Sequence, residues 1–298
     1  MDAPLSRRAF LAGAALAAAS PAAGRIDPIG RTRPSHLKLS LAAYSYRDRL
    51  TAKPPTLDLF GYAEIAADLG LDAIEPTSYY FPPDVEAAFL RKLRNHAFKL
   101  GLDISGTAIR NDFCLPDGPE REKTLAHVRM WVDHAAAMSA PVIRVFAGTV
   151  PKGGDEAEAA ARAVAGIEAS LPYAAERGIC LALENHGGIT ERPEQLLRLV
   201  RAVQAPLGNF GVNLDTGNFH GDDPYADLAE LAPYAVNVQV KTEIGQRGKK
   251  KEDADLARLV GILREAKYSG YVALEYEAAE DATRAIPRHI KALRSLIG

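Results

Sequence analysis

The feature that most constrains the fold is a regular alternation, from residue 37 onward, of short apolar or β-branched runs with longer amphipathic segments. This alternation is typical of parallel βα units. The expected strands are 37–46, 71–76, 102–109, 141–147, 179–184, 210–215, 235–241 and 271–276. The expected helices lie near 57–69, 84–100, 120–138, 155–177, 193–204, 224–231, 252–266 and 280–296.

Eight strands and eight helices are the count of a closed (β/α)8 barrel, and the stretch 37–298 has the length of about 250 residues typical of one. We therefore predict an α/β chain with a single TIM barrel domain over 37–298. An open doubly wound sheet is the rival fold. It normally has a glycine-rich phosphate-binding turn after its first strand, whereas the strand 37–46 leads into Arg47, Asp48 and Arg49.

The overall composition is that of an ordinary globular protein. The chain has 298 residues, 47% hydrophobic and 25% charged, which excludes a disordered chain and a small disulfide-stapled scaffold. Its 36 basic and 38 acidic residues give a net charge of -2, so we expect no nucleic-acid partner. Cys114 and Cys180 belong to no CxxC pair, and we interpret both as free thiols without a chemical role.

The N-terminal segment reads Ser-Arg-Arg-Ala-Phe-Leu-Ala-Gly at 6–13 and continues into an alanine-rich stretch with small residues at 20–23. It resembles a twin-arginine export signal, which a frayed alanine-rich helix would not explain as well. The resemblance implies a signal over 1–24, a mature start within 20–36, the twin-arginine export machinery as a partner and a periplasmic location. The apolar stretch is shorter than the ~20 residues that span a bilayer, so we expect no permanent membrane anchor.

Polar residues stand at the C-terminal ends of the four late strands. In such barrels the C-terminal ends of the strands carry the chemistry. A single carboxylate there is commonly a solvated loop residue, but Glu184, Asp215 and Glu275 end three strands of one barrel. Three converging carboxylates repel one another unless a cation lies between them. Together with the amide oxygen of Gln239 they suit one divalent ion, most readily Mn2+ or Mg2+, with Co2+ or Zn2+ as alternatives.

These motifs resemble the xylose isomerase-like barrel superfamily, in its sugar phosphate isomerase/epimerase branch. The resemblance rests on Leu-Ala-Ala-Tyr-Ser-Tyr-Arg at 41–47, Leu-Gly-Leu-Asp-Ala-Ile-Glu-Pro at 69–76, Ile-Arg-Val-Phe-Ala-Gly at 143–148 and Leu-Glu-Tyr-Glu at 274–277. It implies one catalytic metal held by Glu184, Asp215, Gln239 and Glu275. Gln239 stands where the family usually has a stronger histidine donor, so its use as a ligand is an open question.

The resemblance also implies that Glu184 and Glu275 move the proton. The predicted function is a metal-dependent isomerase or epimerase that acts on a free sugar or sugar derivative through an enediolate. Further substrate-binding candidates lie at or near strand ends, although each also has a plain explanation as a solvated loop residue or an ion-pair member. They are His186, Lys241, Glu75, Arg144, Asn111, Asn218 and His220. Aromatic residues such as Tyr44, Tyr79 and Tyr80 could stack on a sugar or simply cover the barrel mouth.

Other functions stay open at this stage. The same metal and carboxylate pair could perform elimination or hydrolysis on 3-keto sugars or glycosides. A phosphodiesterase of the endonuclease IV kind ranks lower, because it needs a three-zinc cluster with several histidines and few of the seven histidines here end a strand. A non-catalytic sugar-binding barrel is a further alternative, and a homo-oligomer is neither predicted nor excluded.

Overall fold

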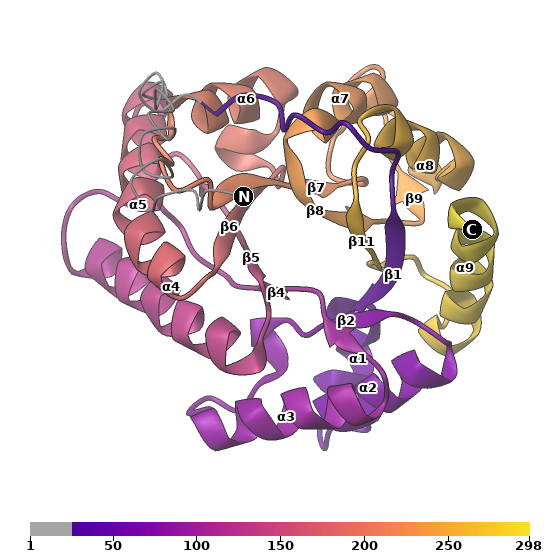
Figure 1. Ribbon diagram of the computed structural model, residues 1–298. Helices are drawn as coiled ribbons and strands as arrows, with labels where there is room; N and C mark the ends of the chain where they lie inside the picture. Colours follow the sequence, from indigo (N-terminus) through magenta and orange to yellow (C-terminus); the bar gives the residue numbers. More distant parts are fainter. Residues whose placement is uncertain (1–25) are drawn as a thin grey trace, which may run out of the picture.

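The computed structural model describes residues 26–298 as a ring of parallel strands surrounded by helices (Figure 1). Every strand pair in the main sheet is parallel, in the order β3-β2-β1-β11-β8-β7-β6-β5-β4. The strands are β1 (Leu37–Ala42), β2 (Ala73–Glu75), β3 (Asp103–Ile104), β4 (Thr107–Ala108), β5 (Val142–Val145), β6 (Cys180–Glu184), β7 (Phe210–Asp215), β8 (Ala235–Val240) and β11 (Gly270–Leu274).

The two ends of this sheet are halves of one kinked strand. Only Ser105 and Gly106 separate β3 from β4, and these two strands close the ring by pairing with β2 and β5. A Cβ atom on Gly106 would lie 2.8 Å from Cγ1 of Val142, so the kink requires a residue without a side chain. Counted this way the barrel has eight strands, and the predicted TIM barrel is confirmed.

Each of the eight expected helices forms within a few residues of its predicted bounds, and they cover the outside of the ring. They are α2 (Leu59–Asp68), α3 (Ala87–Lys99), α4 (Pro119–Met138), α5 (Glu156–Glu176), α6 (Pro193–Ala202), α7 (Pro224–Leu231), α8 (Leu256–Glu265) and α9 (Ala282–Ile297). Aspartate side chains accept hydrogen bonds from the first free N–H groups of several helices, as Asp58 does for α2 and Asp155 for α5.

Two local departures from the expected elements occur at the barrel mouth. The strand expected over 37–46 ends at Ala42, because the chain turns into the 3-10 helix η1 (Ala43–Tyr46) and the short helix α1 (Arg47–Leu50). The helix expected from residue 252 begins at Leu256, because β10 (Glu252–Asp253) pairs antiparallel with β9 (Glu243–Ile244). The exposed Lys249, Lys250 and Lys251 lie in the loop of this hairpin. Three more 3-10 turns are η2 (Ser78–Tyr80), η3 (Gly188–Thr190) and η4 (Ala232–Tyr234).

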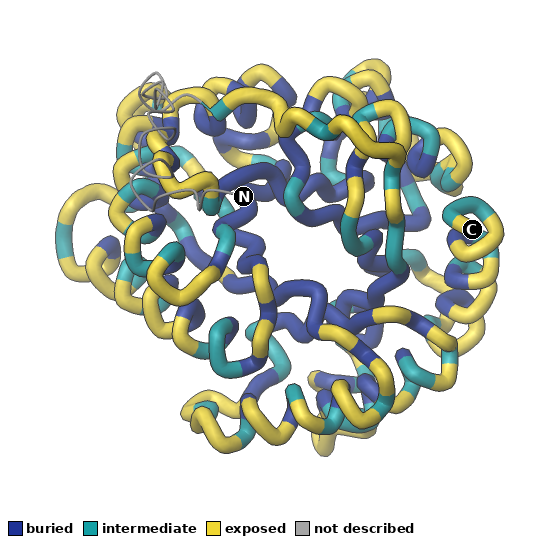
Figure 2. Tube along the Cα trace, viewed as in Figure 1, coloured by how far each residue is buried: buried dark blue, intermediate teal, exposed yellow. Residues whose placement is uncertain are grey.

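Burial follows the layers of the barrel. The strands and the inner faces of the helices are buried, whereas exposed residues lie on the outer helix faces and the loops (Figure 2). Parallel strands covered on both sides are normally apolar, so a buried polar residue on them calls for a partner. The buried polar and charged residues at strand ends include Glu75, Arg144, Glu184, Asp215, Gln239, Lys241 and Glu275.

The described chain begins before the predicted domain boundary at residue 37. The backbone N–H of Ile29 donates to the carbonyl of Pro233 at 3.0 Å, and the Arg31 side chain also donates to that carbonyl, so the segment before β1 packs on the barrel. The predicted export signal over 1–24 lies outside the described residues. Within 26–298, no helix combines the length and the apolar character that a membrane crossing requires.

Candidate active site

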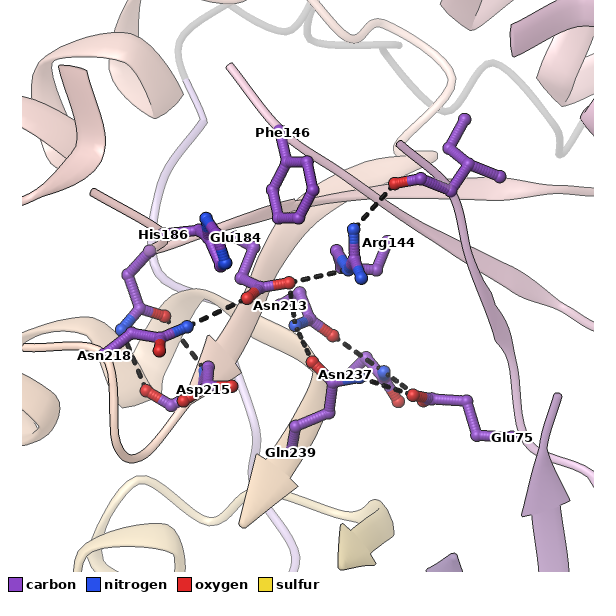
Figure 3. A network of polar contacts seen from close by, with 12 residues as sticks. Glu75, Arg144, Phe146, Glu184, His186, Asn213, Asp215, Asn218, Asn237 and Gln239 are labelled. Carbon is purple, nitrogen blue, oxygen red and sulfur yellow. Dashed lines mark hydrogen bonds and ion pairs between the residues drawn. The ribbon is translucent and has the colours of Figure 1, made fainter. Parts of the chain in front are cut away.

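A buried ion pair joins the ends of β5 and β6. Arg144 Nε lies 2.7 Å from Oε2 of Glu184, and the two side chains are only 6% and 3% exposed (Figure 3). Arg144 also donates to the carbonyl of Ile109 at 2.6 Å, and its guanidinium covers the ring of Phe146. Burial raises the pKa of Glu184 to about 7, against the opposing effect of the Arg144 charge. Glu184 can therefore gain and lose a proton near neutral pH.

A second charged group lies at the ends of β7 and β8. Lys241 Nζ lies 3.2 Å from Oδ2 of Asp215 and 2.9 Å from Oε2 of Glu277, and it donates to Oδ1 of Asn218 at 3.1 Å. Burial by itself would lower the pKa of Lys241, but the surrounding carboxylates, Asp215 first, raise it above its ordinary value. The ammonium group therefore stays charged inside the site.

Backbone contacts hold Asp215 in place. The side chain of Asn185 accepts a hydrogen bond from the N–H of Asp215 at 2.9 Å and donates to its carbonyl at 2.8 Å, which ties the end of β6 to the end of β7. Asp215 Oδ1 accepts from the N–H of Gly217 at 2.8 Å. Oδ2 is fully buried and lacks a hydrogen bond of good geometry, although the Lys241 charge is close to it.

A chain of amide groups crosses the barrel interior and connects two carboxylates (Figure 3). Asn213 donates to Gln239 Oε1 at 2.7 Å and lies 3.4 Å from Oε2 of Glu184. Gln239 Nε2 in turn donates to Oε1 of Glu75 at 2.5 Å, and Asn237 donates to Oε2 of Glu75 at 2.9 Å. Burial raises the pKa of Glu75, while the hydrogen bonds from these two amides act against the shift.

Glu275 differs from the other carboxylates because nothing in the described chain pairs with it. It follows β11, is 7% exposed, and makes neither an ion pair nor a side-chain hydrogen bond with residues 26–298. Burial raises its pKa well above the ordinary value, and the neighbouring Asp215 and Glu184 charges raise it further, against the effect of Lys241. Glu275 is thus a carboxyl group that favours its protonated form.

The donor set fits a divalent cation in charge and only partly in arrangement. Five carboxyl groups meet two cations here: Glu75, Glu184, Asp215, Glu275 and Glu277 against Arg144 and Lys241. The unsatisfied Oδ2 of Asp215 and the unpaired Glu275 are oxygen donors of the kind that Mg2+ and Mn2+ take. Both ends of the Gln239 amide are hydrogen-bonded, so ligation through its oxygen would compete with the hydrogen bond from Asn213. Across residues 26–298, no three His, Cys, Asp or Glu side chains lie close enough together to hold a metal ion as they are placed.

The structure brings most of the predicted site residues together and leaves others apart. His186 lies beside Glu184 with its ring 4.3 Å from that of Phe146, and burial lowers its pKa. The Asn111 side chain donates to the carbonyl of Phe146 at 2.8 Å and accepts from its N–H at 2.9 Å. Asn111 therefore positions the loop after β5. His220 lies in a different pocket, next to Gly245.

Sequence reasoning missed Asn213, Asn237 and Phe146. Asn213 precedes Asp215 by two residues and Asn237 precedes Gln239 by two, so strand alternation alone places each pair on one face. The sequence did contain a signal for both residues. Each is a polar residue inside an apolar strand, two positions from a predicted ligand and therefore on the same face of the strand. Phe146 carried no such signal, because its contact with Arg144 depends on the loop conformation.

Comparison with protein families identifies this barrel. The model of the xylose isomerase-like TIM barrel family matches residues 63–296. The chain belongs to this family. The match spans most of the described chain and includes all of the site residues discussed above. No curated protein sequence matches the chain at a significant level.

Solved structures share the fold at low sequence identity. D-psicose 3-epimerase from Clostridium cellulolyticum H10 aligns with a TM-score of 0.72 and 15% identity over 87% of this chain and 99% of its own. The 3-keto-D-glucoside 4-epimerase of E. coli aligns at 0.64 and 16% identity, over 88% and 99%. A xylose isomerase domain protein from Planctomyces limnophilus aligns at 0.65 and 17%, over 89% and 98%. At these identities the likeness is one of fold.

Proposed function

We propose that this protein is a sugar isomerase or epimerase that moves a proton between Glu184 and Glu275 by way of an enediolate. The observation that carries the proposal is the placement of these two buried carboxyl groups. They stand at the ends of β6 and β11, which flank β7 and β8, and the strands between them supply Asp215 and the charged Lys241. The sugar epimerases among the structural relatives support the same class of reaction.

The two carboxyl groups have distinct roles. Glu184 is paired with Arg144 and has a pKa of about 7, so its carboxylate is available at neutral pH to remove the proton from the carbon next to a carbonyl. Burial raises the pKa of Glu275 well above its ordinary value, and we assign to Glu275 the proton that is delivered to the neighbouring carbon or to the opposite face. The proton count balances, because one proton leaves and one returns.

Charge that develops on the substrate oxygen meets Lys241. Its ammonium group is 8% exposed and already faces Asp215, Glu277 and Asn218. A fixed cation in a site closed to water stabilises an oxyanion more strongly than one in solvent. Lys241 therefore holds the enediolate oxygen while Glu184 and Glu275 exchange the proton.

The proposal includes one divalent ion, Mn2+ or Mg2+, that Glu184, Asp215 and Glu275 would hold through one oxygen each, with the proton of Glu275 on its other oxygen. These side chains are not gathered as a metal cage within residues 26–298, so binding requires them to move together. When bound, such an ion polarises the sugar carbonyl and acidifies the adjacent C–H. Gln239 is left out of the ligand set because its amide bridges Asn213 and Glu75. The export signal expected over 1–24 adds the further proposal that the enzyme works in the periplasm on a sugar or sugar derivative.

The decisive experiment combines two substitutions with solvent exchange. Glu184→Gln and Glu275→Gln should each lower kcat about 10²–10⁴-fold on a sugar that the wild type converts in D2O with deuterium incorporation. Glu280→Gln, at an exposed carboxylate paired with Arg288, is the matched control and should leave kcat unchanged. Full turnover in both site variants would remove the proposal. Retention of activity after complete chelation and dialysis would show that the reaction needs no metal ion, and the metal would be dropped from the proposal.

A further inference from the structure

A cavity lies between the loop that follows β2 and helix α4, next to the residues of the candidate active site. It has a volume of about 500 Å3, within the range of about 300–1,000 Å3 typical of small-molecule sites. We name it the side pocket. Its lining includes Tyr79, Arg110, His127, Met130, Trp131 and His134.

Helix α4 gives the side pocket a wall suited to a flat ring. His127, Met130, Trp131 and His134 are spaced by three, one and three residues, so they share one helix face. Trp131 is only 4% exposed and its ring packs edge-on against that of His134 at 5.1 Å, whereas the apolar Met130 is 44% exposed. These groups present apolar surface together with ring edges that can form hydrogen bonds.

The side pocket has little charge to attract an anion. Burial lowers the pKa of both His127 and His134, so both rings are neutral at neutral pH and can donate or accept hydrogen bonds. The guanidinium of Arg110 lies over the ring of Tyr79, 5.2 Å from its centre. The lining also includes Asp84, whose negative charge disfavours a phosphate. A neutral ring with hydroxyl groups or an aromatic face suits this lining best.

Tyr79 connects the side pocket to the active site. It lines the pocket, and its hydroxyl lies 3.5 Å from Nη2 of Arg144, the residue that pairs with Glu184. Arg144 also donates to the carbonyl of Ile109, the residue before Arg110. One guanidinium therefore contacts both Glu184 and Tyr79 of the pocket wall, so the side pocket and the Glu184 site adjoin at Tyr79.

We propose that the side pocket binds a second ring of the substrate, so that the natural substrate is a glycoside or disaccharide and not a free monosaccharide. The reacting sugar bears the carbonyl that an enediolate requires, as a keto group in a glycoside or as the open-chain aldehyde at the reducing end of a disaccharide. This inference rests on the proposed function, because the reacting sugar is the one held at Glu184. The second ring is a six-membered ring joined through an O-glycosidic bond. It is either an aromatic aglycone or another pyranose, and both can pack against the half-buried rings of His127 and His134 and the exposed side chain of Met130.

Trp131 is the only tryptophan of the chain, so its fluorescence reports on the side pocket alone. Full-length protein is titrated with phenyl β-D-glucopyranoside, phenyl β-D-galactopyranoside and cellobiose, and with free glucose and galactose, under selective excitation of the indole. We expect the two phenyl glycosides and cellobiose, which carry a second ring, to change the Trp131 emission. Their Kd values should be about three- to tenfold lower than those of free glucose and galactose. The phenyl glycosides and cellobiose separate an aromatic from a pyranose second ring.

Two variants test whether the pocket itself is responsible. His134→Ala and Met130→Ala keep Trp131 as the reporter and should each weaken binding of the preferred glycoside about three- to tenfold. Lys123→Ala is the matched control, because Lys123 is exposed on the same helix and pairs with Glu120. It should leave Kd unchanged.

The outcomes separate this inference from the proposed function. No emission change with any glycoside, equal affinity for free sugars and glycosides, or equal binding by His134→Ala, Met130→Ala and wild type would overturn the inference. If glycosides shift the emission and lose affinity in the variants while no sugar is turned over, the side pocket stands and the proposed function fails. If free sugars are epimerised and no glycoside binds, the proposed function stands and the side-pocket inference fails.

Discussion

The late strands and the early strands of this barrel contribute different groups to one mouth. Strands β6, β7 and β8 have five or six residues each and deliver Glu184, Asp215 and Gln239 at or near their ends. Strands β2, β3 and β4 have only two or three residues. With β5 they contribute Glu75, the cation Arg144 and the loops that carry Tyr79 and Arg110.

This difference teaches how a barrel keeps several acids close together. Carboxylates on the late half would repel one another, and Arg144 from the early half is one of the two cations that offset them. Tyr79 and Arg110 from the early half also line the side pocket. In our proposals, the proton-transfer groups and the ring-binding groups therefore come from different halves, which are in contact through Arg144, the partner of both Glu184 and Tyr79.

The largest expected effect comes from breaking the pair that joins the two halves. Arg144→Met should lower the free energy of unfolding by about 3–5 kcal/mol, because it leaves Glu184 buried without its cation. Urea denaturation measures this change. In a Glu184→Gln background the same substitution should cost clearly less, because no carboxylate charge is then left unpaired. Equal costs in both backgrounds would contradict a coupled pair.

An intermediate effect is expected for the amide chain. Gln239→Met should lower the free energy of unfolding by about 1–3 kcal/mol, because Oε1 of Glu75 loses its buried donor. If Gln239 is a bridge and not a ligand, the affinity for Mn2+ measured by calorimetry should change less than about threefold, or less than about 0.7 kcal/mol. Gln204→Met, at an exposed position, is the control for the substitution itself. A large loss of metal affinity would restore Gln239 to the ligand set.

The smallest effect tests the kinked strand of the early half. Gly106→Ala should lower the free energy of unfolding by about 1 kcal/mol, the low end for overpacking, because the new methyl group meets Cγ1 of Val142 at 2.8 Å. Thermal unfolding measures the loss. Val142→Ala in the same chain should recover part of it by removing the opposing atom. If Gly106→Ala unfolds at the same temperature as the wild type, the close contact with Val142 is not the reason for a glycine at position 106.

Much of the fold could be predicted because it depends on local patterns. Apolar runs and amphipathic segments gave the eight strands and eight helices, and glycines such as Gly70 and Gly178 mark the turns between them with positive φ. The hairpin of β9 and β10 could not be predicted. Its strands have two residues each, and its formation depends on pairing across a loop and not on periodicity.

The site could be predicted in part, for a similar reason. Strand ends identified Glu184, Asp215 and Glu275 as neighbours, and the structure places all three among the buried polar residues. The partners of these residues were not predictable. Gln239 reaches Glu75 across 164 sequence positions, and Asn111 turns to the backbone of Phe146, contacts that only the closed barrel creates.

The sequence by itself determined the barrel and which strand ends carry its acids, because side-chain periodicity and the position of polar residues are local properties of the chain. Only the tertiary structure decided which charge faces which. Burial gives Glu184 a pKa of about 7, and no side chain within residues 26–298 pairs with Glu275. The distances between strands bring Arg144 and Lys241 to their acids. Desolvation and Coulomb interactions depend on distances in space, and these exist only once the ring has closed.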